Sequence, residues 1–216
     1  VQHAVRIPVG QAVLEGDLSI PKSAKGIVLF AHGTGSSRKS VRNRFVAECL
    51  NRSHIGTLLM DLLTEEEERD DWLTREHRFD IDLLANRLVE ATDWVKKSPG
   101  TNALLVGYFG ASTGAAAALV AACRRPKEVE AIVSRGGRPD LAGFHLKHVL
   151  APTLLIVGSE DKDVLRLNRV AFEDLKGRKN IHIVPGATHL FEEEGALEEV
   201  AQVAERWFSY FFSYGE

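Results

Sequence analysis

Cysteine is scarce in this sequence, which has two, Cys49 and Cys123, among 216 residues. Both fall in helical patterns, so a disulfide framework is excluded and a reducing compartment is favoured. No apolar run approaches the roughly 18 to 20 residues that cross a bilayer. The opening VQHAVRIPVG lacks the basic start and the apolar centre of a secretory signal. The sequence therefore predicts a cytoplasmic protein without a membrane partner.

Positive charge is not in excess. The 27 Lys and Arg are outnumbered by 30 Asp and Glu, which gives a net charge of −3, and no segment has sustained basicity. This balance excludes the electrostatic footprint of a nucleic-acid-binding protein. The strongest local bias is the acidic run EEEERDD, residues 65–71, which is typical of a solvated loop or helix face. The histidines have no metal-ligand spacing, so we expect no metal site.

Short apolar runs alternate along the chain with longer amphipathic patterns. The apolar runs are Gly26–Ala31, Gly56–Met60, Ala103–Tyr108, Ala131–Ser134, Thr153–Gly158 and Ile181–Pro185. Because most of them lack polar alternation, they indicate parallel strands covered on both faces. Helical patterns lie between them, and residues 4–21 predict a hairpin at the edge of the sheet. The pattern predicts one α/β domain over residues 1–216, with a mostly parallel sheet and helices on both faces.

A serine stands where one apolar run turns into a helical pattern, in LLVGYFGASTGAAAALV, residues 104–120. Ser112 lies between Gly110 and Gly114 in the pattern G-x-S-x-G. In such a tight turn, side chains two positions either side of the serine would collide with neighbouring backbone. The turn also holds the hydroxyl at a helix N-terminus, where negative charge is stabilised. Taken alone, the motif is as typical of a small-residue turn as of a nucleophile, so its partners decide.

Candidate partners of the serine follow the last two apolar runs. Asp161 comes three residues after the end of the first of these runs, and His189 lies in the loop after the second. The order serine, aspartate, histidine, each at a strand end, predicts a catalytic triad of Ser112, Asp161 and His189. Asp163 is an alternative acid, although it is also placed to begin the next helix. His182 is an alternative base, but it lies within a strand run.

The segment FAHGTGSS follows the Gly26–Ala31 run, at the place where a loop for the oxyanion of the tetrahedral intermediate is expected. We assign the two oxyanion donors to the backbone N–H groups of Thr34 and Thr113, the second being the residue after the candidate nucleophile. His32 is interpreted as a brace for the loop rather than a chemical group. The alternative is a plain glycine turn, which the presence of a triad disfavours.

Two segments bear on the substrate. The gap Arg135–Pro152 has room for one short helix and no cap domain, which predicts a shallow, open pocket for small or protruding groups. The excursion Asp61–Phe79 leaves the carboxyl end of a strand and so lies near the rim of the site. Trp72 and Leu73 are candidates for an apolar wall there. The alternative is that Trp72 anchors the excursion to the core.

Two arginines leave the carboxyl end of the Ala131–Ser134 run. Arg135 and Arg138 are therefore candidates to bind a substrate carboxylate, since a guanidinium presents a fork of donors to two oxygens. The alternative is an ion pair of either arginine with Asp140 or Glu160, which would be structural.

Four segments together resemble a known family: HGTGSSRKS, GYFGASTGAAAAL, SRGGRPDLAG and PGATHLFEEEGAL. On these residues, the whole chain resembles an α/β-hydrolase of the dienelactone hydrolase-like family, and a bacterial branch of it in particular. In the last segment, Glu194 stands where that branch has proline. The resemblance implies an eight-stranded sheet, no cofactor, and esterase or lactonase activity. Dienelactone hydrolases proper use a cysteine nucleophile, whereas this chain has Ser112, so their particular substrate is not carried over.

Members of this branch also occur fused behind a phosphoribosyltransferase domain, so the resemblance implies such a domain as a possible fused or neighbouring partner. The function expected is that of a serine hydrolase, which cleaves small esters or lactones through an acyl-serine intermediate. One alternative is an acyltransferase that uses the same acyl-enzyme; the open site favours water as the acceptor. Another is a small-molecule receptor without catalysis, against which an intact triad argues.

Overall fold

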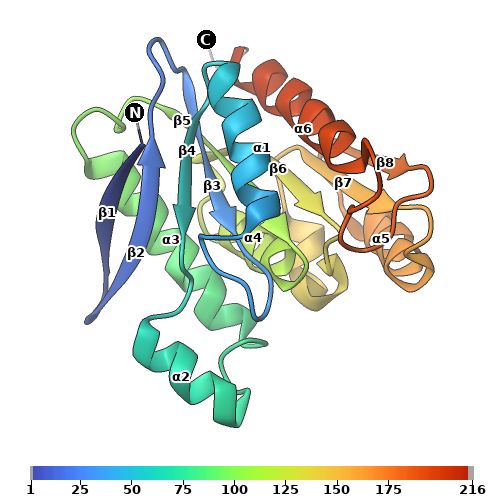
Figure 1. Cartoon of the computed structure of the whole chain (residues 1–216), viewed down its shortest axis with the longest axis horizontal. Coiled ribbons are helices and arrows are strands. Elements are labelled where there is room, and N and C mark those ends of the chain that lie inside the picture. Colours follow the sequence, from blue (N-terminus) through green and yellow to red (C-terminus); the bar gives the residue numbers. More distant parts are fainter. Residues whose placement is uncertain (1, 214–216) are drawn as a thin grey trace.

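The computed structural model describes residues 2–213, and within this range eight strands form one sheet in the order β1-β2-β4-β3-β5-β6-β7-β8 (Figure 1). The strands are β1 (Gln2–Val9), β2 (Ala12–Ser19), β3 (Gly26–Ala31), β4 (Gly56–Met60), β5 (Leu105–Ala111), β6 (Val129–Arg135), β7 (Thr153–Gly158) and β8 (Lys179–Val184). Strand β2 is antiparallel to β1 and β4, which confirms the edge hairpin, and all other neighbours are parallel. The carboxyl ends of β3 to β8 therefore meet at one edge of the sheet.

Helices cover both faces of the sheet, as the sequence predicts. Helices α1 (Val41–Arg52) and α6 (Ala196–Ser213) lie on one face, and α3 (Ile81–Lys97), α4 (Thr113–Arg124) and α5 (Lys162–Asp174) lie on the other. Strand β3 shows why its run is wholly apolar: Ile27 and Leu29 pack toward α3 and α4, whereas Val28 and Phe30 pack toward α1 and α6. Alternate side chains of a strand point to opposite faces, so a strand covered on both faces needs apolar residues throughout.

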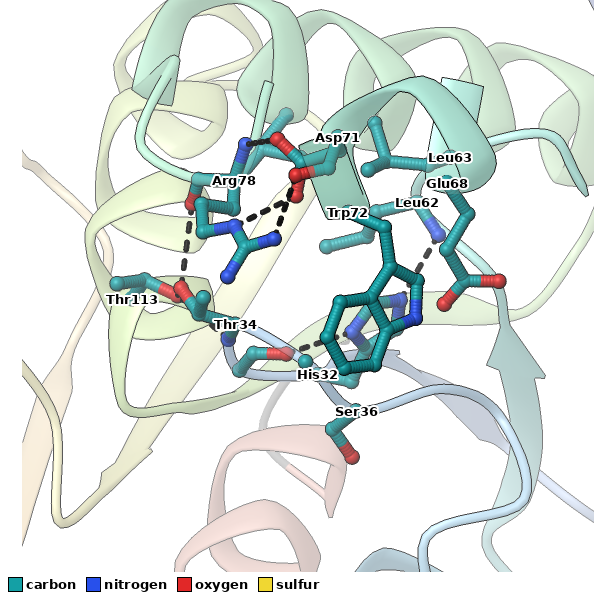
Figure 2. A pocket seen from close by; sticks show the side chains of 13 residues that line it. His32, Thr34, Ser36, Leu62, Leu63, Glu68, Asp71, Trp72, Arg78 and Thr113 are labelled. Atoms are coloured by element: carbon teal, nitrogen blue, oxygen red, sulfur yellow. Dashed lines mark hydrogen bonds and ion pairs between the residues drawn. The ribbon is translucent and has the colours of Figure 1, made fainter. Parts of the chain in front are cut away.

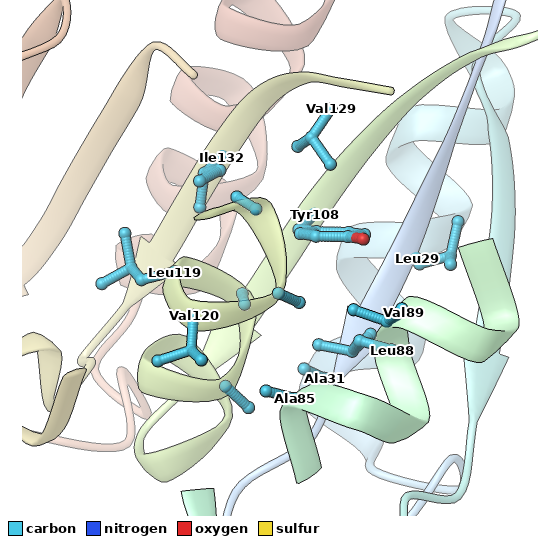
Figure 3. Packing of buried hydrophobic residues seen from close by; sticks show 14 of the residues in the cluster. Leu29, Ala31, Ala85, Leu88, Val89, Tyr108, Leu119, Val120, Val129 and Ile132 are labelled. Atoms are coloured by element: carbon cyan, nitrogen blue, oxygen red, sulfur yellow. The ribbon is translucent and has the colours of Figure 1, made fainter. Parts of the chain in front are cut away.

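The strand that leads to the candidate nucleophile is densely packed in the middle of the sheet. Tyr108, on β5, is fully buried among aliphatic side chains such as Leu29 and Leu88 (Figure 3). Its hydroxyl lies 2.6 Å from the Thr92 hydroxyl, and that hydroxyl donates to the carbonyl of Leu88 at 2.8 Å. Burial raises the pKa of Tyr108. The phenol is therefore neutral and satisfied, and it supports the strand that leads into the serine.

Three strands, β5, β6 and β8, differ in extent from their predicted runs, and β8 spans Lys179–Val184 rather than Ile181–Pro185. Strand β5 continues past Tyr108 to Ala111, because Gly110 and Ala111 still pair with β3 or β6. Strand β6 likewise runs from Val129 to Arg135. Glycine is a weak strand former, so the sequence pattern ends β5 too early. Tertiary pairing on both sides of β5 overrides this preference, and the strand delivers its last residue directly to Ser112.

The acidic run forms a helix. Helix α2 (Glu65–Thr74) begins at a capping box, in which Thr64 and Glu67 each accept a backbone N–H at the start of the helix. Among its residues, Asp71 alone is buried. The helix protrudes from the body of the protein at the carboxyl edge of the sheet (Figure 1). Between β6 and β7 the chain forms one 3₁₀ helix, η1 (Pro139–His148), which is kinked at Gly143.

Candidate active site

Ser112 occupies a strained turn between β5 and α4, with φ 51° and ψ −122°. A Cβ atom on Gly110 would lie 2.4 Å from the Cα of Ala115, and one on Gly114 would lie 2.2 Å from the carbonyl oxygen of Ala31. Neither contact is possible, so glycine is required at both positions. The predicted function of the two glycines therefore has a direct steric basis, and a non-glycine residue at positive φ stands between them.

The turn is pinned to the neighbouring strand by its own backbone. The N–H of Ser112 donates to the carbonyl of Arg135 at 3.3 Å, and its carbonyl accepts from the N–H of Arg138 at 3.0 Å. These bonds tie the serine to the end of β6. They hold the strained backbone in place without using the hydroxyl, which lines an open cavity.

Asp161 and His189 are brought together from the ends of β7 and β8. The Nδ1 atom of His189 lies 2.6 Å from Oδ2 of Asp161, and the two side chains are 41% and 14% exposed. A carboxylate only accepts hydrogen bonds, so Nδ1 carries the proton and Nε2 is left as the acceptor. The alternatives lie elsewhere: Asp163 is exposed in the first turn of α5, and His182 contacts Glu199 at 2.7 Å.

Ser112 and His189 line one cavity of about 240 Å³. Its other walls come from the loop after β3, from the first turn of α1, and from Arg135 and Leu190. The cavity is small and open to solvent, and the side chains that surround the serine are mostly polar. The arrangement brings a serine hydroxyl, an imidazole whose Nε2 can accept a hydrogen bond, and a carboxylate to one edge of the sheet.

The two residues assigned to the oxyanion donors are joined by a chain of hydrogen bonds. The N–H of Thr34 donates to Oγ1 of Thr113 at 3.0 Å, the two hydroxyls are 3.0 Å apart, and Oγ1 of Thr34 donates to the carbonyl of Arg78 at 3.2 Å. Because the hydroxyl proton of Thr34 is donated to the carbonyl of Arg78, the hydroxyl of Thr113 must donate to Oγ1 of Thr34. The N–H of Thr34 thus has an internal acceptor, which the sequence pattern did not reveal. The sequence signal that could have indicated this acceptor is the hydroxyl residue directly after the serine, Thr113.

His32 braces the loop that carries Thr34. Its Nδ1 donates to the carbonyl of Gly33 at 2.9 Å, and its Nε2 accepts the N–H of Leu62 at 3.0 Å (Figure 2). Burial lowers the pKa of His32, which keeps the ring neutral and suits it to one donated and one accepted bond. The interpretation of His32 as a structural brace agrees with this geometry.

Arg135 ends β6 as a buried cation beside the serine. Its side chain lines the same cavity, its residue is 6% exposed, and its Nη2 donates to Oδ1 of Asn43 at 3.3 Å. Its Cζ lies 5.9 Å from the ring centre of Phe191. Burial, together with the smaller effect of the neighbouring charge of Arg42, lowers the pKa of Arg135 to about 10. Among residues 2–213, no carboxylate lies within 4.0 Å of Arg135, and no hydrogen-bond partner meets its Nε.

The two candidate arginines therefore differ. Arg138 holds Asp140 with two bonds of 2.9 and 2.8 Å, so the structural alternative applies to this residue. Glu160, the other expected partner, lies instead 3.3 Å from Lys162. Arg138 is also outside the lining of the serine cavity, so it is not placed to bind a substrate there.

Two residues of the first turn of α1 that the sequence pattern did not reveal, Arg42 and Asn43, also line the serine cavity. Arg42 contacts the exposed Glu192 at 3.3 Å, while Asn43 is buried and supports Arg135. Both follow the loop after β3 closely in sequence. That loop ends at the carboxyl edge of the sheet, so the helix that follows it necessarily starts there.

Trp72 projects from α2 into a second cavity, of about 260 Å³, on the other side of the loop after β3 (Figure 2). The residue is 80% exposed, so it does not anchor the excursion to the core. Leu73, its predicted partner in the wall, is 87% exposed and is not part of the lining. The wall is therefore formed by Trp72 with other residues, not by the predicted pair.

Within residues 2–213, no group of three or more His, Cys, Asp or Glu side chains is arranged to hold a metal ion. In the same range, no helix combines the length and the apolar character needed to cross a membrane.

Comparison with known proteins places the chain among hydrolases. The model of the dienelactone hydrolase family matches residues 15–214. A crystal structure described as dienelactone hydrolase from Anabaena variabilis ATCC 29413 is 59% identical, with a TM-score of 0.96 over 98% of both chains. Est1E from Butyrivibrio proteoclasticus is 15% identical, with a TM-score of 0.81 over 97% of this chain and 99% of that one. This second likeness concerns the α/β-hydrolase fold alone.

Two Mycobacterium tuberculosis proteins, from strains CDC 1551 / Oshkosh and ATCC 25618 / H37Rv, are each 55% identical over 204 residues. Both carry a provisional name as a phosphoribosyl transferase. The match covers 94% of this chain but 45% of theirs, so the chain spans about half the length of these curated relatives. The family model and the Anabaena structure both extend over nearly the whole sequence. The chain belongs to the dienelactone hydrolase family.

Proposed function

We propose that the protein is a serine hydrolase that cleaves small carboxylic esters or lactones with Ser112, His189 and Asp161. The observation that carries this proposal is the shared cavity of Ser112 and His189, together with the 2.6 Å bond between His189 and Asp161. The bond orients the ring so that its free nitrogen is the base. Family membership supports hydrolysis as the reaction.

In the proposed reaction, His189 Nε2 takes the proton of Ser112 as Oγ bonds to the carbonyl carbon of the ester. The tetrahedral intermediate collapses when the bond to the alcohol oxygen breaks, and that oxygen takes the proton from His189. Water then attacks the acyl-serine with the same base, and the carboxylic acid leaves as Ser112 regains its proton. The carboxylate of Asp161 stabilises the imidazolium formed in each half.

The oxyanion would lie against the N–H groups of Thr34 and Thr113. The N–H of Thr113 belongs to the first turn of α4, whose first N–H groups have no acceptor within the helix. The N–H of Thr34 already points to the Thr113 hydroxyl at 3.0 Å. The substrate oxygen would therefore replace that hydroxyl as the acceptor, and the Thr113 side chain would keep its second bond to Thr34 Oγ1.

Because Arg135 is a buried cation in the serine cavity, we propose that the substrate carries an anionic group. An uncompensated buried cation is costly, and a carboxylate in the serine cavity would supply a counter-charge that residues 2–213 do not. We expect Arg135→Met to raise KM for the nitrophenyl monoester of succinic acid about tenfold to a hundredfold, the range for losing a hydrogen bond to a charged group. Nitrophenyl butyrate, in which a methyl group replaces the carboxylate, should change little.

The matched control is Arg138→Met, because Arg138 is bound to Asp140 outside the cavity. In Arg138→Met, the ratio of KM for the succinic acid monoester to KM for nitrophenyl butyrate should equal that of the unmodified protein. An equal loss on both esters in Arg135→Met would show a role in packing against Phe191 and Asn43, and would remove Arg135 from substrate binding.

The whole function is tested with the unmodified protein by hydrolysis of nitrophenyl acetate and nitrophenyl laurate, and by reaction with a fluorophosphonate. We expect turnover of the acetate, little turnover of the laurate because the cavity holds about 240 Å³, and one phosphonyl group on Ser112 located by peptide mass. If the protein shows no turnover of either ester and no labelling by the fluorophosphonate, the receptor alternative is favoured. Ester exchange with an added alcohol at the expense of hydrolysis would favour the acyltransferase.

A phosphoribosyltransferase domain is a proposed neighbour of this domain. The support is the name of the two Mycobacterium tuberculosis relatives and the part of their length that this chain does not match.

A further inference from the structure

The cavity beside Trp72 adjoins the serine cavity. On the side of β4, α2 and α3 its apolar lining comes from Leu62, Leu63, Trp72 and Leu84, and α2 adds two carboxylates at the edge. The segment from Gly33 to Ser36 forms its opposite side, and Gly33, Thr34 and Ser36 line both cavities. One loop thus separates the two spaces, and it is the loop that carries the proposed oxyanion donor Thr34 (Figure 2).

The exposed side chain of Trp72 is not needed to hold helix α2 in place. Helix α2 is held by other groups: Glu67 pairs with the largely buried Arg87 of α3, and Asp71 binds Arg78, whose carbonyl accepts the hydroxyl of Thr34. The helix therefore keeps its position without the indole. A large aromatic side chain that is 80% exposed and directed into an apolar cavity is instead placed to cover a bound group.

The charges around this cavity differ in sign from those of the serine cavity. Burial raises the pKa of Asp71, but bonds from Arg78 and from the N–H of His77 outweigh it, so the pKa is lowered and the charge is matched by Arg78. Glu68 is exposed at the cavity, and no cation among residues 2–213 lies within 4.0 Å of its carboxylate. An anion would be repelled here, whereas Arg135 attracts one on the other side of the loop.

We propose that the cavity beside Trp72 is a second substrate subsite, which takes an uncharged aromatic ring carried by the ester. This inference rests on the proposed function, since it places the ring relative to a carbonyl bound at Ser112. With its oxygen on the N–H of Thr34, that carbonyl has one substituent next to the shared loop and so at the entrance of the cavity. A cavity of about 150 Å³ is enough to bind benzene, so one of about 260 Å³ accommodates a single substituted ring.

The test compares kcat/KM of Trp72→Ala, Trp72→Phe and Leu73→Ala on phenyl acetate and on ethyl acetate. Hydrolysis is measured by the release of protons. Leu73 is the matched control, because it is on the same helix and exposed but outside the lining. We expect Trp72→Ala to lower kcat/KM for phenyl acetate about fivefold to tenfold, the size of one aromatic contact. Trp72→Phe should retain most of the kcat/KM for phenyl acetate. The kcat/KM for ethyl acetate should be the same in all variants, and Leu73→Ala should leave both substrates unaffected.

A binding measurement separates this inference from the proposed reaction. Phenylacetamide, an uncharged ring compound, is titrated by calorimetry into Ser112→Ala with and without Trp72→Ala. We expect binding that weakens about fivefold to tenfold when Trp72 is removed and that is unchanged by Leu73→Ala. Equal binding with and without Trp72 would overturn the subsite and leave the triad proposal intact. Full ester hydrolysis by Ser112→Ala would overturn the triad while the titration still reports on the cavity.

Discussion

Ser112→Ala should lose on the order of 10⁴- to 10⁶-fold in kcat for nitrophenyl acetate, the scale seen when a triad nucleophile is removed. The reason is that Ser112 is held in a strained turn between two obligatory glycines at the start of α4 and shares its cavity with His189. Alanine keeps the Cβ atom and therefore the steric strain at φ 51°, so the fold should be unaffected. Steady-state kinetics and thermal unfolding, measured side by side, check both statements.

The residual rate of this variant is informative. Binding and the oxyanion donors would remain, so a rate above that of water alone is expected even without the nucleophile. The variant should also take up no phosphonate on the peptide that contains position 112. Turnover near that of the unmodified protein would contradict the role of Ser112, and labelling at another position would identify the true nucleophile.

Asp161→Asn should lower kcat about 10⁴-fold, although the substitution changes one atom. In the structure, Asp161 accepts the Nδ1 proton of His189 at 2.6 Å. An asparagine amide can present its NH₂ group to Nδ1, which favours the tautomer with the proton on Nε2. That tautomer cannot accept a proton from Ser112, so the base is lost while the geometry is kept.

Asp163→Asn is the matched control for this prediction. Asp163 is exposed in the first turn of α5 and lies two positions from Asp161 in the sequence. Its charge there favours the helix N-terminus by typically 0.3 to 1 kcal/mol, so a small loss of thermal stability and about full activity are expected. If Asp163→Asn were the inactive variant, the acid of the triad would have to be reassigned.

The choice between these two aspartates shows the limit of the sequence pattern. Both follow the same strand and both are acidic, so spacing favours Asp161 only by its distance from the strand end. The bond to His189 is made by residues 28 positions apart. It depends on where the loop after β8 places the ring, and that placement is a property of the whole sheet edge.

Burial distinguishes the two arginines in the same way. Arg135 and Arg138 both leave β6 at its carboxyl end, and their side chains carry the same charge. Arg138 meets Asp140 two positions away, a local contact. Arg135 meets Asn43 across 92 positions, and this contact lies inside the serine cavity.

What the sequence by itself determined was local or followed from chain order: alternating strands and helices, the glycines around Ser112, and three candidate residues that each follow a strand. Parallel strands bring their carboxyl ends to one edge, so order along the chain already implied a common site. Only the tertiary structure decided that the Thr34 N–H points to the Thr113 hydroxyl, that no carboxylate in the described part of the chain pairs with Arg135, and that the Trp72 side chain is exposed. These features depend on contacts between distant segments, whose distances no local pattern encodes.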